Sequence, residues 1–361
     1  MKNKTINTLG LFSGGGGLDL GFSVAGFKLV ASSDIDEYST KTLKINQNKK
    51  PYYLAHPVIC KDITGLSKKL ILKAADVKNI DFVIGGPPCQ AFSVFGKRRG
   101  LSDPRGSLVF DYSRLIEEIQ PKGFLFENVA GLKSIHDGLL YEHLIEMLSF
   151  NGKYAISTHE YEVADFGVPQ FRRRVFLLGS LNGHYIPEMC PTHAPPHSLF
   201  NKKRPYNTVE KAISNLPPIV TSWGEKPNLN IHVGRNHSDR IIKRYSSLKF
   251  GERDHKTRIN KLNPKRPSFT IIVGSDKGGG KGHVHPYSHR EVTPRESARL
   301  QSFPDWWEFY GNGRHAIRQV GNAVPPLFSA LLASHIKKHV FGYKYKKSYE
   351  TIIKRLDLNF L

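Results

Sequence analysis

The chain has 361 residues, and its 53 Lys and Arg against 31 Asp and Glu give a formal net charge of +22. This length can bury a real core, and the charge is typical of a protein that binds a polyanion, although an acidic protein partner or a solubility role would also account for it. Cys60, Cys89 and Cys190 are scattered, which argues against a disulfide framework and a cysteine zinc site and fits a reducing cytosol. No apolar run reaches the length of a membrane span, and the basic N-terminus does not read as a signal peptide.

The first half of the chain alternates apolar runs with amphipathic stretches. In chain order we expect a strand at 6–12, a helix at 17–25, a strand at 27–33, a helix at 37–46, a strand at 81–85, a helix at 107–119, and strands at 123–127, 154–161 and 175–179. Apolar residues between 140 and 148 fall on one face of a further helix, which Asp137 would cap. This alternation predicts an α/β fold with a mostly parallel sheet and helices on both faces.

The sequence changes character after residue 179. Residues 187–227 are rich in Pro, Asn, His and Lys, and residues 232–289 are dense in Arg, Lys, His and Gly, with little apolar periodicity. We therefore predict a smaller, irregular, β-rich domain at 186–289. Helical patterns return at 294–300 and 325–339.

The most informative segment is the loop at residues 85–93, Gly-Gly-Pro-Pro-Cys-Gln-Ala-Phe-Ser, which follows an apolar run. Its glycines and prolines end the preceding strand abruptly, and open α/β sheets place their chemistry at strand ends. A lone cysteine is usually a small buried apolar residue. Because Cys89 lies on a rigid loop among small and polar neighbours, the sequence favours a nucleophile there.

Further motifs occur in order around this loop. They are Leu-Phe-Ser-Gly-Gly-Gly-Gly-Leu at 11–18, Asp-Pro-Arg-Gly at 103–106, Glu-Asn-Val at 127–129, Gln-Phe-Arg-Arg-Arg at 170–174, Arg-Glu-Ser-Ala-Arg-Leu-Gln-Ser-Phe-Pro at 295–304 and Gly-Asn-Ala-Val-Pro-Pro at 321–326. The ordered set resembles the DNA (cytosine-5)-methyltransferases of bacterial restriction-modification systems, from about residue 6 to 185 and again from about 265 to 340. Gly10 departs from the aspartate that the family often has, and Ala91 from its glycine.

The resemblance implies a Rossmann-like methyltransferase that moves a methyl group from S-adenosylmethionine to C5 of a cytosine within a specific sequence of duplex DNA. It implies a catalytic and cofactor-binding domain at 1–185, a target recognition domain at 186–289, and a C-terminal segment at 290–361 that returns to the catalytic domain. We expect a monomer in the bacterial cytoplasm, associated with the nucleoid and not with a membrane. A cognate restriction endonuclease is implied as the functional counterpart of this protective methylase.

The loop at 12–17 is a weak ligand signal by pattern alone. Asp19 stands where a dinucleotide fingerprint needs its third glycine, and no P-loop lysine follows, so a plain tight turn remains an alternative. The resemblance implies a site for S-adenosylmethionine, with S-adenosylhomocysteine as the product. The implied contacts are Phe12, Ser13, Gly14 and Gly17 in the loop, Asp34 at the ribose hydroxyls, Ile35 at the adenine face, Asp62 and Ile63 at the adenine edge, and Asn322 and Val324 on the C-terminal side.

The resemblance also implies a covalent mechanism. The target base must be flipped out of the duplex, and the Cys89 thiolate, on the loop shaped by Pro88, then adds to C6. Glu127 would bind the N3 side of the base as a proton donor, although a surface glutamate or an ion pair is the alternative reading of this residue alone. Arg174 would hold the base carbonyl or brace Glu127, and Arg172 would support the site because alternate strand residues share a face.

Cations that follow the cysteine would meet DNA phosphates when their loop closes. The implied DNA contacts are Ser93, Lys97, Arg98 and Arg99. Two other functions stay open, an RNA cytosine-5 methyltransferase and a DNA-binding protein that has lost catalysis. A metal site at His283, His285 and His289 is a weaker alternative because no cysteine or acid accompanies them, so we expect no metal.

Overall fold

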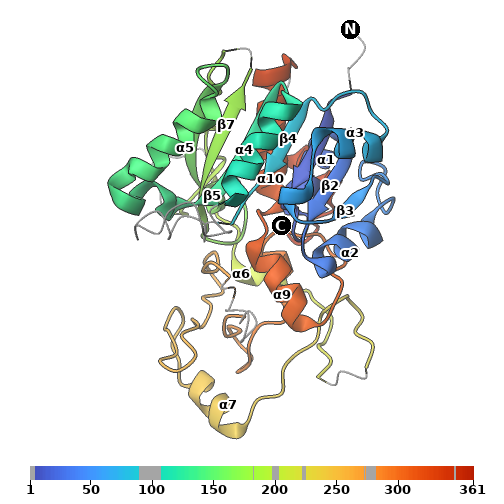
Figure 1. Cartoon of the computed structure of the whole chain (residues 1–361). Coiled ribbons are helices and arrows are strands. Elements are labelled where there is room, and N and C mark those ends of the chain that lie inside the picture. Colours follow the sequence, from blue (N-terminus) through green and yellow to red (C-terminus); the bar gives the residue numbers. More distant parts are fainter. Residues whose placement is uncertain are drawn as a thin grey trace. The chain divides into compact units, whose positions relative to one another are not determined.

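The computed structural model describes residues 5–88, 107–181, 183–196, 203–221, 225–271, 273, 282–344 and 347–361. The chain divides into two compact units (Figure 1). The first unit comprises Met1–Tyr161, Arg173–Cys190 and Ala330–Lys347, and the second comprises Glu162–Arg172, Pro191–Ser329 and Ser348–Leu361. These bounds differ from the proposed functional segments, because most of 290–361 groups with the second unit. No helix in these ranges is long and apolar enough to cross a membrane.

A seven-stranded sheet organises the first unit, in the order β3-β2-β1-β4-β5-β7-β6. Its strands are β1 (Asn7–Leu11), β2 (Lys28–Asp34), β3 (Val58–Cys60), β4 (Phe82–Gly85), β5 (Gly123–Val129), β6 (Ala155–Glu162) and β7 (Arg173–Ser180). The first five strands pair in parallel, and β7 is antiparallel to β5. The predicted α/β class and mostly parallel sheet are therefore confirmed.

Helices alternate with these strands. They are α1 (Gly17–Ala25), α2 (Glu37–Asn46), α3 (Lys68–Ala75), α4 (Ser107–Ile119), α5 (Leu139–Ser149) and α10 (Pro326–Phe341), with the 3-10 helices η1 (Ile63–Gly65) and η3 (Ala130–Gly138). The predicted bounds of α1, α2 and α4 are confirmed, whereas β3 and α3 were not predicted. The expected cap of α5 was wrong: η3 continues to Gly138, so Asp137 lies inside that helix and Gly138 is the N-cap.

Both faces of the sheet are covered. On one face Val83 and Phe126 belong to a core cluster that residues of α3, α4 and α5 complete, and Figure 1 shows α4 and α5 over the sheet. On the other face the Phe82 ring packs 5.7 Å from that of Phe22 in α1 and 6.0 Å from that of Phe341 in α10. Side chains of neighbouring strand residues point to opposite faces of the sheet, so the continuous apolar runs of β4 and β5 supply buried side chains to both faces.

The second unit has little regular structure in its described part. Its helices are η4 (Val163–Phe166), α6 (Val209–Ile213), α7 (Asp239–Ser246), α8 (Pro294–Leu300), α9 (Gly313–Asn322) and α11 (Tyr349–Leu356), and its strands are β8 (His193–Ala194) and β9 (Arg204–Pro205). Isolated bridges such as that between residues 253 and 260 replace longer ladders. The region is irregular as predicted, but its described part is poorer in strand than expected.

Buried charges hold the loops of this unit. Arg295 in α8 is completely buried and donates to the carbonyls of Asn230 at 3.0 Å, Pro304 at 3.2 Å and Trp307 at 2.8 Å. Burial lowers the pKa of Arg295 to about 10, which still leaves it charged at neutral pH. These bonds tie α8 to the carbonyls of neighbouring loops, so Arg295 of the Arg-Glu-Ser-Ala-Arg motif has an architectural role.

Candidate active site at the strand ends

The loop between β1 and α1 is tightly curled. Phe12, Gly14 and Gly16 all have positive φ, at 53°, 51° and 83°. This is costly for a phenylalanine, and such residues concentrate at functional sites. Gly16 caps α1 without a side-chain hydrogen bond, which leaves N–H groups of the first turn available to a ligand.

Asp34 lies at the end of β2, against this loop. Its Oδ2 accepts from the backbone N–H of Gly14 at 2.7 Å, and its Oδ1 accepts from that of Asp36 at 2.8 Å. Each carboxylate oxygen has a second acceptor position, so a ribose hydroxyl can still be bound. The next residue, Ile35, is 66% exposed and offers an apolar surface beside that carboxylate.

Asp62 and Ile63 follow β3, which pairs with β2 so that Cys60 lies opposite Asp34. Asp62 Oδ1 accepts from the backbone and hydroxyl of Thr64, both at 2.9 Å, while Oδ2 makes no hydrogen bond within the described ranges. The Ile63 side chain is buried in the core. The ends of β1, β2 and β3 thus bring an apolar surface and two carboxylates together, which fits an adenosine group.

Asn322 and Val324 lie in the second unit. Asn322 ends α9, and Val324 is buried. The buried guanidinium of Arg172 donates to the carbonyl of Gly321 at 2.8 Å and to that of Asn322 at 3.4 Å. Arg172 therefore holds the backbone of the Gly-Asn motif, and the expected cofactor contacts of Asn322 and Val324 stay predictions.

The Gly-Gly-Pro-Pro loop begins where β4 ends, beside the end of β5. The buried Asn128 donates from Nδ2 to the carbonyl of Pro87 at 3.1 Å. A Cβ atom on Gly86 would lie 2.7 Å from Glu127 Oε2, so glycine alone lets the loop approach that carboxylate this closely. Pro88 is exposed at the end of the described segment.

Glu127 and Arg174 form an ion pair, with Nε and Oε1 3.2 Å apart and both side chains mostly buried. Glu127 lies opposite Phe176, and Arg174 lies opposite Val129, so the two side chains are diagonal neighbours on one face of the antiparallel pair. The sheet thus brings together two residues that the sequence assigned to catalysis.

Two residues near this pair were missed by the sequence reading. Gly86 and Asn128 both lie in recognised motifs but had no assigned role. A polar side chain such as Asn128, at the end of an apolar strand, needs a buried partner, and that requirement was the available signal. Cys89 and the expected DNA contacts Ser93, Lys97, Arg98 and Arg99 lie outside the described residues, so their roles stay predictions.

The histidines of the second unit are engaged by the backbone. His283 Nε2 lies 3.0 Å from the carbonyl oxygen of Thr270, and His285 Nδ1 accepts from the backbone N–H of Tyr287 at 3.2 Å. Burial lowers the pKa of His285 to about 4. In the part of the chain that the structure describes, no three His, Cys, Asp or Glu side chains are grouped to hold a metal ion.

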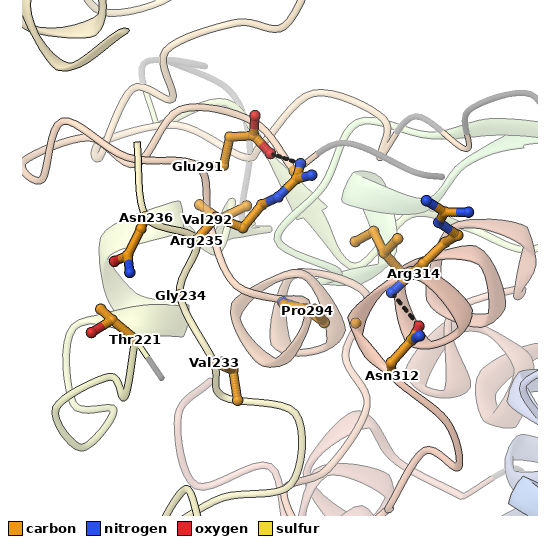
Figure 2. A pocket seen from close by; sticks show the side chains of 13 residues that line it. Thr221, Val233, Gly234, Arg235, Asn236, Glu291, Val292, Pro294, Asn312 and Arg314 are labelled. Carbon is orange, nitrogen blue, oxygen red and sulfur yellow. Dashed lines mark hydrogen bonds and ion pairs between the residues drawn. The ribbon is translucent and has the colours of Figure 1, made fainter. Parts of the chain in front are cut away.

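The second unit contains a cavity of about 610 Å³ (Figure 2). Its lining residues are Thr221, Val233, Gly234, Arg235, Asn236, Gly282, Glu291, Val292, Pro294, Asn312, Gly313, Arg314 and Ile317. Arg235 pairs with Glu291 at 3.1 Å, and Asn312 caps α9 by accepting from the backbone N–H of Arg314 at 3.1 Å. Exposed arginine and asparagine side chains at this cavity suit a nucleic-acid partner.

Comparison with known proteins agrees with this geometry. The sequence model of the C-5 cytosine-specific DNA methylases matches residues 6–338. The Type II methyltransferase M1.HphI of Haemophilus parahaemolyticus is 34% identical over 344 residues, covering 92% of this chain and 87% of that protein. M.AquIA of a Picosynechococcus species is 43% identical over 256 residues, covering 67% of this chain and 98% of that protein.

Solved structures share the fold. A DNA modification methyltransferase encoded within an E. coli prophage superposes with a TM-score of 0.75 at 28% identity, over 93% of this chain and 100% of that one. The Dnmt2 methyltransferase of S. pombe has a TM-score of 0.64 at 19% identity, over 92% of this chain and 98% of that one, and shows the fold alone. Because the family's sequence model covers almost the whole length, the chain belongs to the C-5 cytosine-specific DNA methylases.

Proposed function

We propose that Glu127 and Arg174, with Cys89 on the adjoining loop, form the catalytic centre of this DNA cytosine-5 methyltransferase. The observation that carries the proposal is the ion pair between Glu127 and Arg174, beside a Gly-Pro turn that Asn128 holds in place. The pair lies at the carboxyl end of β5, next to the loop that carries the cysteine. It can therefore meet a base that Cys89 attacks.

In the proposed reaction the Cys89 thiolate forms a bond to C6 of the flipped cytosine, and the C5–C6 π electrons shift toward C4 so that negative charge develops on N3. Glu127 gives a proton to N3, which neutralises the charge that this addition creates. Arg174 holds the Glu127 carboxyl group in position. S-adenosylmethionine, when bound, supplies the methyl group to C5. A water molecule then takes the C5 proton, the electrons of that C–H bond re-form the C5–C6 double bond as the C6–S bond breaks to release the Cys89 thiolate, and the N3 proton returns to Glu127.

We further propose that the residues at the ends of β1, β2 and β3 hold the methyl donor, S-adenosylmethionine. Asp34 accepts from the ribose hydroxyls, Ile35 and Phe12 pack on the adenine, and Asp62 accepts from its exocyclic amine. The loop of Ser13, Gly14 and Gly17 would hold the amino-acid end, and Asn322 and Val324 would complete the pocket. The support for this proposal is the pairing of the loop with Asp34 and the exposure of Ile35. No metal enters the scheme.

The second unit supplies the proposed DNA reader. We assign target recognition to residues 186–289, and propose that the cavity bordered by Arg235 and Arg314 meets the DNA backbone, with Ser93, Lys97, Arg98 and Arg99 as further contacts. The net charge of +22 supports a polyanionic substrate. A cognate endonuclease, a cytoplasmic location near the nucleoid and a monomeric state complete the proposal.

The test of the catalytic centre is Cys89→Ser. We expect this variant to lose methyl transfer to duplex DNA, because a hydroxyl is a far weaker nucleophile than a thiolate, while its affinity for cofactor and DNA stays near that of the wild type. Duplex DNA containing 5-fluorocytosine, which has no C5 proton to lose, should trap the wild type covalently and not the variant. Substantial methyl transfer by Cys89→Ser would remove the covalent mechanism. Methyl transfer to folded RNA, measured beside transfer to duplex DNA, tests the alternative of an RNA cytosine-5 methyltransferase.

A further inference from the structure

A chain of buried polar side chains lies beneath the loop between β1 and α1, and the proposed chemistry does not use it. Asp19 of α1 is 1% exposed; its Oδ1 is 3.2 Å from the hydroxyl of Ser13 and its Oδ2 is 2.6 Å from that of Ser32. The Ser32 hydroxyl is also 2.9 Å from His56 Nε2, and His56 Nδ1 is 2.9 Å from the carbonyl oxygen of Leu54. The chain thus joins the loop to a distant histidine.

Counting protons along this chain leaves two fully bonded arrangements. The Leu54 carbonyl only accepts, so His56 Nδ1 carries a proton. If His56 is neutral, Nε2 accepts from Ser32, and the Ser32 oxygen must then receive a proton from Asp19. If Asp19 is ionised instead, Ser32 donates to it and His56 must be a cation. If Asp19 were ionised and His56 neutral, the single hydroxyl proton of Ser32 could serve only one of them. When that proton points to Asp19, the Ser32 oxygen and His56 Nε2 face each other as two acceptors.

Burial decides between the two arrangements. The second arrangement buries two charges that are separated by a hydroxyl group, and the free energy needed to remove both charges from water is large. Burial raises the pKa of Asp19 from 3.8 to about 6, with a smaller contribution in the same direction from the negative charge of Asp34. Burial lowers the pKa of His56, and it raises that of Tyr53, the other titratable group that faces Asp19. Below about pH 6 these groups together favour a protonated Asp19 beside a neutral His56.

The Asp19 carboxyl group also fills the space under the first strand. A Cβ atom on Gly10 would lie 2.7 Å from Asp19 Oδ1 and 2.7 Å from the Ser13 hydroxyl, so a side chain at position 10 and this carboxyl group exclude each other. Ser13 itself donates its backbone N–H to the carbonyl of Ser33 at 3.0 Å. The centre of the strained loop is therefore held from β2 by its backbone and from α1 by its side chain.

We propose that Asp19 is a positioning residue for the methyl-donor loop, a buried carboxyl group, protonated in mildly acidic solution, that holds Ser13 and is itself oriented by Ser32 and His56. The inference rests on the proposed role of this loop in binding S-adenosylmethionine. It adds a residue that touches neither the cofactor nor the base and acts through Ser13. Asparagine reproduces the protonated acid, because its amide donates to Ser32 and its carbonyl accepts from Ser13.

The first test compares Asp19→Ala with Asp19→Asn by titration calorimetry with S-adenosylhomocysteine at pH 6. Alanine should weaken binding by about tenfold or more through loss of buried hydrogen bonds, and asparagine should restore most of it. Equal affinity of Asp19→Ala and the wild type would overturn the positioning role. An asparagine variant as weak as the alanine variant would overturn the protonated state.

The second test uses the protein without cofactor. A carboxyl group whose pKa is raised in the folded state contributes stability that is present below 3.8 and is lost as pH rises through about 6. His56 acts in the opposite sense but is present in both proteins. The Tm of Asp19→Asn relative to the wild type should therefore rise as pH increases from about 4 to about 6. Parallel pH profiles would show that Asp19 does not titrate.

Controls separate the possible failures. Asp81→Ala removes a buried carboxyl group at the other end of the sheet, which accepts from the backbone of Asn7 at 3.0 Å, and it should lower Tm without changing cofactor affinity. If Asp19→Ala does not fold, Ser32→Ala breaks the same chain by removing one hydroxyl group and should weaken binding severalfold. Unchanged affinity in both Asp34→Ala and the Asp19 variants would show that the loop does not bind the donor, which is a failure of the proposed function.

Discussion

Asp34 shapes the loop between β1 and α1 and is also the proposed acceptor for the ribose hydroxyls. Its carboxylate accepts from the backbone of Gly14, which has a left-handed conformation, and from the backbone of Asp36. Ile35, directly after it, is exposed and places apolar surface beside the carboxylate, where the proposed adenine would pack.

Replacing Asp34 by alanine should weaken binding of S-adenosylmethionine by about 1.5–3 kcal/mol, the range for lost charge-assisted hydrogen bonds. Titration calorimetry measures this directly. Asp36→Ala is the matched control, because Asp36 caps α2 by accepting from the Ser39 backbone at 3.2 Å and has no proposed ribose contact. Unchanged affinity in Asp34→Ala would withdraw the ribose assignment.

The junction between the Gly-Gly-Pro-Pro loop and β5 is the element that positions the proposed catalytic residues. Asn128 ties the turn to the strand, Gly86 leaves room for Glu127, and the antiparallel neighbour β7 presents Arg174 on the same face. Each of these contacts joins elements that are far apart in the sequence. Motif recognition identified Glu127 and Arg174, while the contacts that hold them in place needed the folded sheet.

Asn128→Ala should lower kcat by about tenfold with little change in the Kd for cofactor. The variant leaves the buried carbonyl of Pro87 without its donor and frees the turn that carries Cys89, so the cost falls on the geometry of the attack. Single-turnover kinetics and calorimetry separate the two effects. A variant with normal kcat would show that the turn is held by its prolines alone.

Gly86→Ala should be more severe, since its Cβ atom would lie 2.7 Å from Glu127 Oε2. The carboxyl group must then shift away from its place beside Arg174, and kcat should fall further than in Asn128→Ala. Gly152→Ala is a control for the glycine change, because nothing lies within 4 Å of its Cβ position, although its positive φ carries its own strain. Equal activity of Gly86→Ala and the wild type would exclude this packing constraint.

At the scale of the whole molecule, the basic charge is a property that no single element explains. Phosphate contacts release counterions, so log affinity for duplex DNA should fall linearly with log salt, with a slope steeper than about −4 if several contacts form. Arg98→Ala with Arg99→Ala should make the slope shallower without changing the methylated sequence. The control, Lys69→Ala with Lys73→Ala on α3, removes the same amount of charge and should leave the salt slope unchanged. Equal slopes in the two double variants would remove the loop from the DNA interface.

The proposed separation of target recognition from cofactor binding leads to a test of specificity. If residues 186–289 read the target, replacing them by the corresponding segment of a relative with another specificity should change which cytosine is methylated. Bisulfite sequencing of host DNA identifies that cytosine. Cofactor affinity should stay unchanged, since the strand-end groups are untouched. An active hybrid that keeps the original target would place recognition elsewhere.

The tail shows what a sequence pattern leaves open. Residues 344–361 are basic and partly amphipathic, a pattern that fits packing and phosphate contact alike, and the structure forms α11 there, whose Tyr349 hydroxyl accepts from Asn207 at 3.0 Å. The carbonyl of Leu356 accepts from the Trp306 indole at 3.2 Å. Packing within the second unit therefore accounts for this helix.

The sequence by itself determined the local and ordered features of this protein. Apolar runs, glycines and caps are local signals, so the bounds of α1, α2, α4 and α8 could be predicted, and the ordered motifs identified the family. The three-residue β3 and the eight-residue α3 are too short to show a clear period, although Ser67 was an available cap signal. In the second unit, buried arginines and backbone contacts replace the apolar periodicity that prediction needs.

Only the tertiary structure decided which polar groups meet. In the sequence, Asp19 appeared only as the residue that replaces the third glycine of a dinucleotide fingerprint, and Ser32 and His56 carried no signal. In the structure the three side chains form one buried hydrogen-bonded chain beneath the loop between β1 and α1. The sequence placed Arg172 in a general supporting role, but only the structure shows that it holds the backbone of the Gly-Asn motif, whereas Arg174 pairs with Glu127. The physical reason is that a buried hydrogen bond depends on the positions of two distant segments, which become fixed only when the sheet and its helices have packed.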